Sequence, residues 1–133
     1  MKRVFVFIFL APASVSGEPV DYVVENAAAI PAPLSGDRDE ALDGAILYRS
    51  AGCADCHDTE AAPSLETVAA RLTEGEIRLM IVEPRIALPE TKMPAYYTPG
   101  RFGETAPDLV GRTRLTAAEI EAIIEFLLAG AAK

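Results

Sequence analysis

Cys53-Ala54-Asp55-Cys56-His57 is the stretch that decides the fold of this chain. The pattern Cys-x-x-Cys-His is the attachment signature of c-type haem. Two thiols three positions apart on a short helical turn can reach both vinyl groups of one porphyrin. The adjacent His57 then lies under the iron as its proximal ligand. The motif therefore predicts one covalently attached haem c, held by Cys53 and Cys56.

The small number of Cys and His residues excludes several other kinds of site in this chain. Its 133 residues include two Cys and one His, all within residues 53–57. A disulfide-rich scaffold and a four-ligand Cys/His zinc site are therefore excluded. The net charge of -8 argues against nucleic-acid binding, because such a protein needs a basic patch to neutralise phosphates.

Two interpretations of the motif without haem are weaker. A thioredoxin-like redox pair would follow a β-strand, whereas the residues before Cys53 have a helical pattern. A disulfide between Cys53 and Cys56 would close a loop too small to stabilise the chain much.

The iron needs a distal ligand, and the chain has no second His. Met1 belongs to the leader, and Met80 falls on an apolar helix, where it is expected to fill the core. Met93 lies in a Pro-rich loop, and Pro94 would stiffen the turn that presents its thioether. Met93 is therefore predicted as the distal ligand. Methionine ligation raises the reduction potential, and two occupied axial positions favour electron transfer over catalysis at the iron.

Four more residues are expected around the haem. The Pro63 carbonyl is predicted to accept the second ring N–H of His57, although an ordinary loop proline also fits this position. Arg71, Tyr97 and Arg101 are predicted as partners of the haem propionates, and a surface role fits each of them equally well.

The rest of the pattern predicts an all-α domain over residues 37–133. The clearest helix is the last, where Thr116 and Glu119 form a capping box and Gly130 follows as a stop. Apolar residues recur along it at helical spacing, at Ile120, Ile123, Ile124, Leu127 and Leu128.

A first helix is expected to run from a cap at Asp37 or Asp39 to about residue 51, with Gly52 as its stop. Gly44 then falls in mid-helix, where Gly costs about 1 kcal/mol relative to Ala. We therefore expect Gly44 to allow a close approach to the last helix, near Phe126.

Between these two helices, residues 65–72 form a short amphipathic run. A helix over residues 77–83 follows, begun by a capping box of Thr73 and Glu76 and ended by Pro84. Residues 84–114 are predicted to be a long loop, because they are rich in Pro and Gly. A haem would give this loop an apolar surface to pack on.

Residues 1–17 are predicted to be a secretory signal peptide. A short basic start is followed by an apolar run over residues 4–11 and by small residues, with cleavage after Ala13 or Gly17. The apolar run is well short of the ~20 residues that a spanning helix needs, which disfavours an uncleaved anchor. Removing two basic residues with this leader leaves 10 basic and 20 acidic residues, a net charge of -10. We expect the mature chain in the periplasm, with no membrane span.

Residues 18–36 contain three Pro and are expected to form an extended N-terminal arm. The arm either wraps over the core or a partner, or is a loosely ordered tail.

The order of these features resembles a class I cytochrome c. A Gly-x-x-Leu-Tyr segment at residues 44–48 precedes the haem motif. Pro63-Ser64-Leu65, the Met93 loop and the amphipathic C-terminal helix follow it. The resemblance implies the class I cytochrome c fold with an N-terminal extended arm.

Within this class, residues 63–71, 81–85 and 91–97 resemble the SoxX family. SoxX is the monohaem cytochrome subunit of the SoxAX complex of bacterial sulfur oxidation. The resemblance covers about residues 40–129. It departs at Glu66-Thr67, where a Gly is expected close by, and this departure bears on loop shape rather than on haem ligation.

The SoxX resemblance implies a partner and a pathway. SoxAX-like complexes attach thiosulfate oxidatively to a cysteine of the carrier SoxYZ, and the SoxA subunit holds the site of sulfur chemistry. This chain would then form a heterodimer with a SoxA-like cytochrome, meet a SoxYZ-like carrier transiently, and pass electrons to a downstream acceptor. It would have no catalytic site of its own. The cysteine count agrees independently, because the haem would consume both thiols.

Three other functions stay open. The first is a free-standing periplasmic cytochrome c that delivers electrons to a terminal oxidase. The second is a haem enzyme or gas sensor with a labile methionine ligand, and the third is a thiol oxidoreductase without haem.

The charge is unevenly distributed along the chain. Residues 18–76 hold 3 basic and 13 acidic side chains, whereas residues 77–114 hold 6 basic and 4 acidic ones. A partner could dock on a basic surface near Met93, or on an apolar patch of Pro94, Ala95, Tyr96 and Tyr97. The alternative is that the charged residues only form a solvated face.

Overall fold

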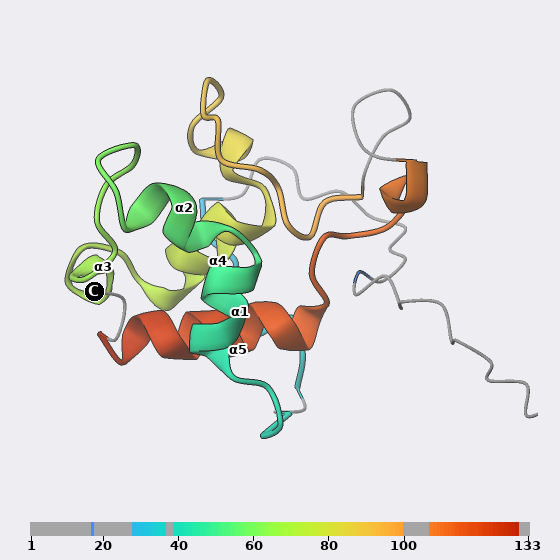
Figure 1. Ribbon diagram of the computed structural model, residues 1–133, viewed down its shortest axis with the longest axis horizontal. Coiled ribbons are helices and arrows are strands. Elements are labelled where there is room, and N and C mark those ends of the chain that lie inside the picture. The colour runs from blue at the N-terminus through green and yellow to red at the C-terminus, as the bar shows by residue number, and fades with distance from the viewer. Residues whose placement is uncertain (1–16, 18–27, 37–38, 100–106, 131–133) are drawn as a thin grey trace, which may run out of the picture.

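The computed structural model describes residue 17 and residues 28–36, 39–99 and 107–130. Almost all of the predicted signal peptide and most of the predicted arm lie outside these residues. The described residues form five α-helices and two 3-10 turns (Figure 1). These are α1 Gly44–Ser50, α2 Cys53–His57, α3 Val68–Arg71, α4 Glu74–Val82 and α5 Ala117–Leu128, with η1 Pro84–Ile86 and η2 Pro107–Leu109. No strand occurs in the described part of the chain, and the predicted all-α class is confirmed.

Both predicted capping boxes are present. At the start of α5, Thr116 Oγ1 accepts the Glu119 N–H at 3.2 Å, and the Glu119 carboxylate accepts the Thr116 N–H at 2.8 Å. Thr73 and Glu76 form the same reciprocal pair at the start of α4. Each box satisfies two N–H groups that a helix start otherwise leaves unpaired.

The first helix begins later than the sequence pattern predicts. Its N-cap is Asp43, whose carboxylate accepts the N–H groups of Ala45 and Ile46, and not Asp37 or Asp39. Asp39 instead accepts the Ala41 N–H at 3.0 Å, which closes a turn ahead of the helix. Gly44 is therefore the first residue of α1 and not a mid-helix residue.

Gly44 lies where α1 crosses α5 (Figure 1). A Cβ at this position would lie 2.2 Å from Ala122 O and 2.8 Å from Phe126 Cβ. One helical turn further on, the Tyr48 and Phe126 rings pack with their centroids 5.4 Å apart. The predicted close approach between the first and last helices is therefore confirmed, and only Gly permits it.

The hydrophobic core lies around α5. Residues from α1, α3, α4 and the segment before α5 pack against this helix. Its buried members on α5 are Ala117, Ile120, Ile123, Ile124 and Leu127. Leu128 was predicted on the same face but is 37% exposed. It is the last residue of α5 and lies just beyond the buried Leu127.

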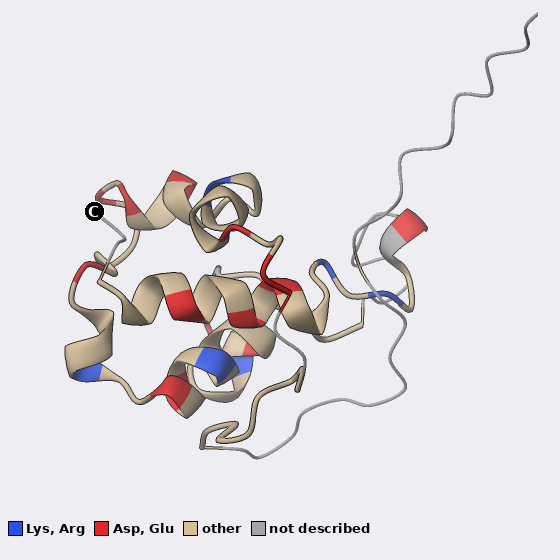
Figure 2. Cartoon of the chain, turned by 90° about the horizontal axis from the view of Figure 1, so that it is seen from below, with Lys and Arg blue, Asp and Glu red and all other residues tan. Residues whose placement is uncertain are grey.

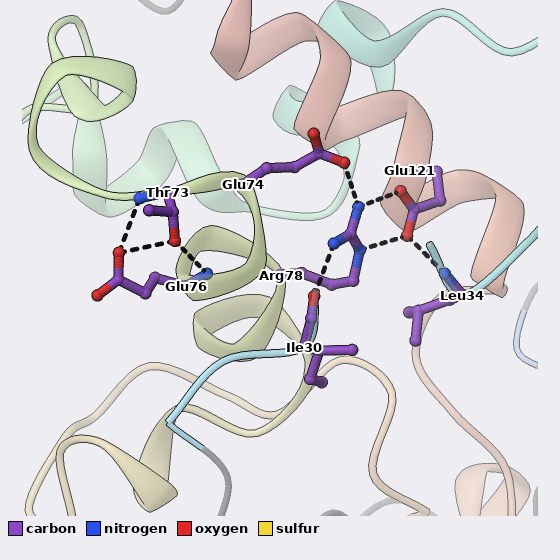
Figure 3. Close-up of polar contacts among 7 residues, drawn as sticks. All are labelled: Ile30, Leu34, Thr73, Glu74, Glu76, Arg78 and Glu121. Carbon is purple, nitrogen blue, oxygen red and sulfur yellow. Dashed lines mark hydrogen bonds and ion pairs between the residues drawn. The ribbon is translucent and has the colours of Figure 1, made fainter. Parts of the chain in front are cut away.

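Arg78 on α4 is a fully buried charge. Its guanidinium forms a two-pronged ion pair with Glu121 of α5, at 2.8 Å from Nε to Oε1 and 2.9 Å from Nη2 to Oε2 (Figure 3). Nη2 also donates to Glu74 at 2.5 Å, and Nη1 donates to the Ile30 carbonyl at 2.7 Å. The Glu121 carboxylate is the main reason that the pKa of Arg78 is raised above its usual value. Each guanidinium nitrogen therefore donates to a protein acceptor, which compensates for the loss of water around the buried charge.

The same network holds residues 28–36 against the helices. The Leu34 N–H donates to Glu121 Oε1 at 2.9 Å (Figure 3). The Ile30 N–H donates to the Gly75 carbonyl at 3.0 Å. A Cβ on Gly75 would lie 3.1 Å from Ile30 O, so the chain passes close to α4 here. This part of the predicted arm lies over α4 and α5 and is not a loose tail.

The long segment after α4 is mostly irregular, as its Pro and Gly content predicts. The helix ends at Val82, and the buried Pro84 starts η1. Pro ends a helix because it lacks the N–H and its ring blocks the preceding turn. The segment then returns to the core at Tyr96, whose N–H donates to the Ile81 carbonyl at 3.0 Å.

Replacing Gly44 tests the close contact between α1 and α5. We expect Gly44→Ala to lower the free energy of unfolding by about 2–3 kcal/mol, because the new methyl group meets backbone atoms that cannot yield without separating the helices. Gly36→Ala is the control, since nothing lies within 4 Å of a Cβ there. Urea unfolding followed by circular dichroism measures both, and equal stability of the two variants would contradict the packing argument.

Removing the Glu121 carboxylate tests the Arg78 network. We expect Glu121→Ala to cost about 3–5 kcal/mol of unfolding free energy, because it leaves a buried guanidinium with one partly exposed carboxylate. Glu74→Ala is the matched control and is expected to cost about 1 kcal/mol or less, since the Glu74 side chain is half exposed. Similar losses in the two variants would mean that Arg78 does not depend on Glu121.

Candidate functional site

The haem-attachment motif forms its own short helix. Gly52 separates α1 from α2 with a φ of 84°, a left-handed conformation that Gly adopts without strain. Gly52 therefore stops the first helix, as predicted. Cys53 and Cys56 then lie one turn apart on α2, and both are free thiols. Cys53 is half-buried and Cys56 is exposed.

His57, the last residue of α2, is oriented by a carbonyl. Its Nδ1 lies 2.8 Å from Pro63 O. A carbonyl can only accept, so Nδ1 carries the proton and donates, which leaves the Nε2 lone pair free to bind a metal ion. This is the second-sphere contact that a ligating imidazole needs to keep a single orientation.

A tyrosine on α1 holds the residue that follows His57. The Tyr48 hydroxyl donates to Asp58 Oδ1 at 2.7 Å, and Tyr48 itself is 2% exposed. Burial, followed by the hydrogen bond to Asp58, raises the pKa of Tyr48 well above its usual value. Tyr48 therefore stays protonated and remains a donor, which links α1 to the end of α2.

Met93 lies in the irregular segment between η1 and Tyr96. Its side chain is partly buried and packs against the core cluster, and its N–H donates to Thr91 Oγ1 at 3.1 Å. Met80, expected to fill the core, is only partly buried on α4. Both methionines are therefore more accessible than core residues, and Met93 is the one on a non-helical segment.

The three predicted propionate partners differ in their surroundings. Arg71 is exposed at the end of α3, and its Nη2 donates to the Ser64 carbonyl at 2.6 Å. Tyr97 is 7% exposed, and its N–H donates to the Val82 carbonyl at 3.4 Å. Arg101 lies outside the described residues.

Tyr96, which the sequence pattern placed only in a possible apolar docking patch, lies near the haem-attachment motif. Its hydroxyl donates at 2.9 Å to the carbonyl of Ala51, which lies two residues before Cys53. Burial raises the pKa of Tyr96 to about 12, so the hydroxyl stays protonated. Burial likewise raises the pKa of Cys53 to about 11, so this thiol stays protonated at neutral pH. No local sequence signal marks Tyr96, because its contact at Ala51 lies 45 residues away.

The surface around the Met93 segment is less basic than the residue count indicates. Arg78 is buried and neutralised, and Arg85 forms an ion pair with Glu83 at 2.6 Å. Figure 2 shows the Lys and Arg residues of the described chain in blue and the Asp and Glu residues in red. The predicted apolar patch is also reduced, because Tyr96 and Tyr97 are each only 7% exposed. Pro94 and half-buried Ala95 stay accessible.

These donor groups fit a covalently attached haem. Two free thiols one helical turn apart can form thioethers, and the adjacent imidazole has one nitrogen fixed and the other free. The partly buried thioether of Met93 is a soft donor of the kind that suits haem iron. Within the described residues, no helix is long and apolar enough to cross a bilayer.

Comparison with known proteins bears on the fold and the motif. Residues 41–131 match the family Cytochrome c. A chain of the crystal structure of SoxXA from P. pantotrophus is similar to this chain, with a TM-score of 0.64 and 27% sequence identity. The similarity covers 81% of this chain and 93% of the other. No curated protein matches the chain.

Proposed function

Because the chain belongs to the cytochrome c family and carries one covalent haem c, we propose that it is the electron-transfer subunit of a SoxAX-like complex. The complex attaches thiosulfate oxidatively to a cysteine of a SoxYZ-like carrier protein. The observation that carries the proposal is the similarity to a SoxXA chain over 81% of this sequence. That similarity extends beyond the haem motif, which any cytochrome c shares.

Each residue of the site has one role in this proposal. Cys53 and Cys56 form the thioethers, His57 binds the iron on the proximal side through Nε2, and Met93 binds it on the distal side. Pro63 O holds the His57 ring in place by accepting the Nδ1 proton at 2.8 Å. A haem bound in this way exchanges single electrons, and two occupied axial positions leave no site for substrate at the iron.

The sulfur chemistry belongs to another chain in this proposal. Cys53 and Cys56 are the only cysteines of the sequence, and both are bound to the haem. No thiol is left to hold a sulfur intermediate, so a SoxA-like cytochrome supplies that site. Electrons released there reach the haem of this chain and leave to a downstream acceptor in the periplasm.

Arg71 and Tyr97 are proposed haem neighbours with different duties. Tyr97 is buried and suits a contact with a propionate inside the protein, whereas Arg71 is exposed and already bound to the Ser64 carbonyl. Arg71 therefore supports the loop between α2 and α3. Arg101 completes the proposed set of propionate partners.

A pull-down from the periplasm tests the proposed complex. We expect the tagged chain to retain haem in a denaturing gel and to co-purify with a second haem-containing subunit in equal amounts. The double variant Cys53→Ala/Cys56→Ala is the control and is expected to lose both haem and partner. A stable monomer that reduces a terminal oxidase directly would instead support the free-standing cytochrome.

Replacing Met93 tests the distal ligand. We expect Met93→Ala to lose the weak near-infrared band of methionine-bound ferric haem and to have a lower reduction potential, because the thioether stabilises the ferrous state. Met80→Ala is the control and is expected to keep the band. Loss of the band in Met80→Ala alone would reassign the distal ligand to Met80.

A further inference from the structure

Tyr96 connects four segments of the chain. Its N–H donates to Ile81 O of α4 at 3.0 Å. Its carbonyl accepts the N–H groups of Arg114 and Leu115, at 2.9 and 3.1 Å, from the segment before α5. Its hydroxyl donates to Ala51 O, at the C-terminal end of α1, at 2.9 Å. The backbone bonds fix where Tyr96 sits, and the hydroxyl then reaches across to the haem-attachment side.

The hydroxyl contact lies close to both ends of the proposed haem ligation. Ala51 is two residues before Cys53, and Tyr96 is three residues after Met93. Three residues span at most about 11 Å, so Met93 cannot move far while Tyr96 is held. One buried side chain therefore joins the Met93 segment to the start of α2.

We propose that Tyr96 is a positioning residue that ties the Met93 segment to the haem-attachment helix and thereby sets the strength of the bond between the Met93 thioether and the iron. The proposal rests on Met93 as the distal ligand of the proposed function. It adds a residue that does not touch the iron but controls the ligand that does.

The physical argument concerns the freedom of the Met93 segment. A ligand on an irregular segment can leave the iron only if that segment moves, and each anchor that restricts the movement favours the bound state. The hydroxyl bond is buried, because Tyr96 is 7% exposed, so water does not readily replace it. Without the hydroxyl, the Ala51 carbonyl loses this partner and the segment loses its tie to α2.

Imidazole binding to the ferric holoprotein measures the strength of the Met93 bond, because imidazole must displace the thioether. We expect Tyr96→Phe to bind imidazole about fivefold more tightly than the wild type, the equilibrium equivalent of one ordinary hydrogen bond. The variant keeps the buried ring, so the core stays filled. Its reduction potential is expected to fall as well, since a weaker thioether bond stabilises the ferrous state less.

Thr98→Val is the matched control. Thr98 is buried in the same segment, two residues further on, and its hydroxyl donates to Val82 O of α4 at 3.3 Å. The control therefore also removes one buried hydroxyl bond, but not the tie to α2, and is expected to bind imidazole as the wild type does. An unchanged imidazole affinity in Tyr96→Phe, or an equal rise in both variants, would overturn the positioning role.

The Met93→Ala variant separates this inference from the ligand assignment. If Met93→Ala leaves the near-infrared band of the holoprotein intact, Met93 is not the distal ligand, and both the assignment and the inference fail. If Met93→Ala abolishes the band but Tyr96→Phe changes nothing, the assignment stands and only the role of Tyr96 fails.

Discussion

The close contact between α1 and α5 at Gly44 is the constraint on which the rest of the structure depends. Because no side chain separates the two backbones, α1 is fixed on α5, and α2 follows after a single turn at Gly52. The positions of both cysteines and of His57 are therefore set by the long C-terminal helix, although none of them lies on it. Tyr48 strengthens this relation, because it packs on Phe126 and its hydroxyl holds Asp58 beside His57.

The Arg78 network fixes α4 on α5, as the Gly44 contact fixes α1 on α5. A buried guanidinium is costly unless it is paired and hydrogen-bonded, and here two carboxylates and one carbonyl accept hydrogen bonds from all three of its nitrogens. The guanidinium is planar and binds both oxygens of the Glu121 carboxylate. This geometry allows only one placement of α4 relative to α5. Since α4 leads into the segment that carries Met93, this ion pair helps to define the distal side of the proposed site, just as Gly44 defines the proximal side.

The sequence predicted the features that depend on neighbouring residues. Capping boxes, the period of α5 and the haem motif all lie within a few residues, so their chemistry is visible in the chain itself. The predicted start of the first helix was wrong, because several aspartates in this stretch can cap a helix. In the structure the cap is Asp43, and the next residue, Gly44, packs against Ala122. Arg78 was counted as surface charge, since its partner Glu121 is 43 residues away. The hydrogen bond from Tyr96 to Ala51 was missed for the same reason, because the two residues are 45 positions apart.

The described part of the arm is attached through backbone hydrogen bonds and through the side chains of Ile30 and Leu34, which pack against the core. Ile30 uses its N–H and carbonyl, and Leu34 uses its N–H, while the intervening residues 31–33 are exposed. Backbone hydrogen bonds do not depend on which side chains the residues carry. The position of the arm along the helices is therefore fixed, whereas the side chains of residues 31–33 are free to vary. An engineer could therefore rewrite these three positions, for instance to introduce a label or a new recognition sequence. The arm would remain seated on α4 and α5 through the bonds of Ile30 and Leu34.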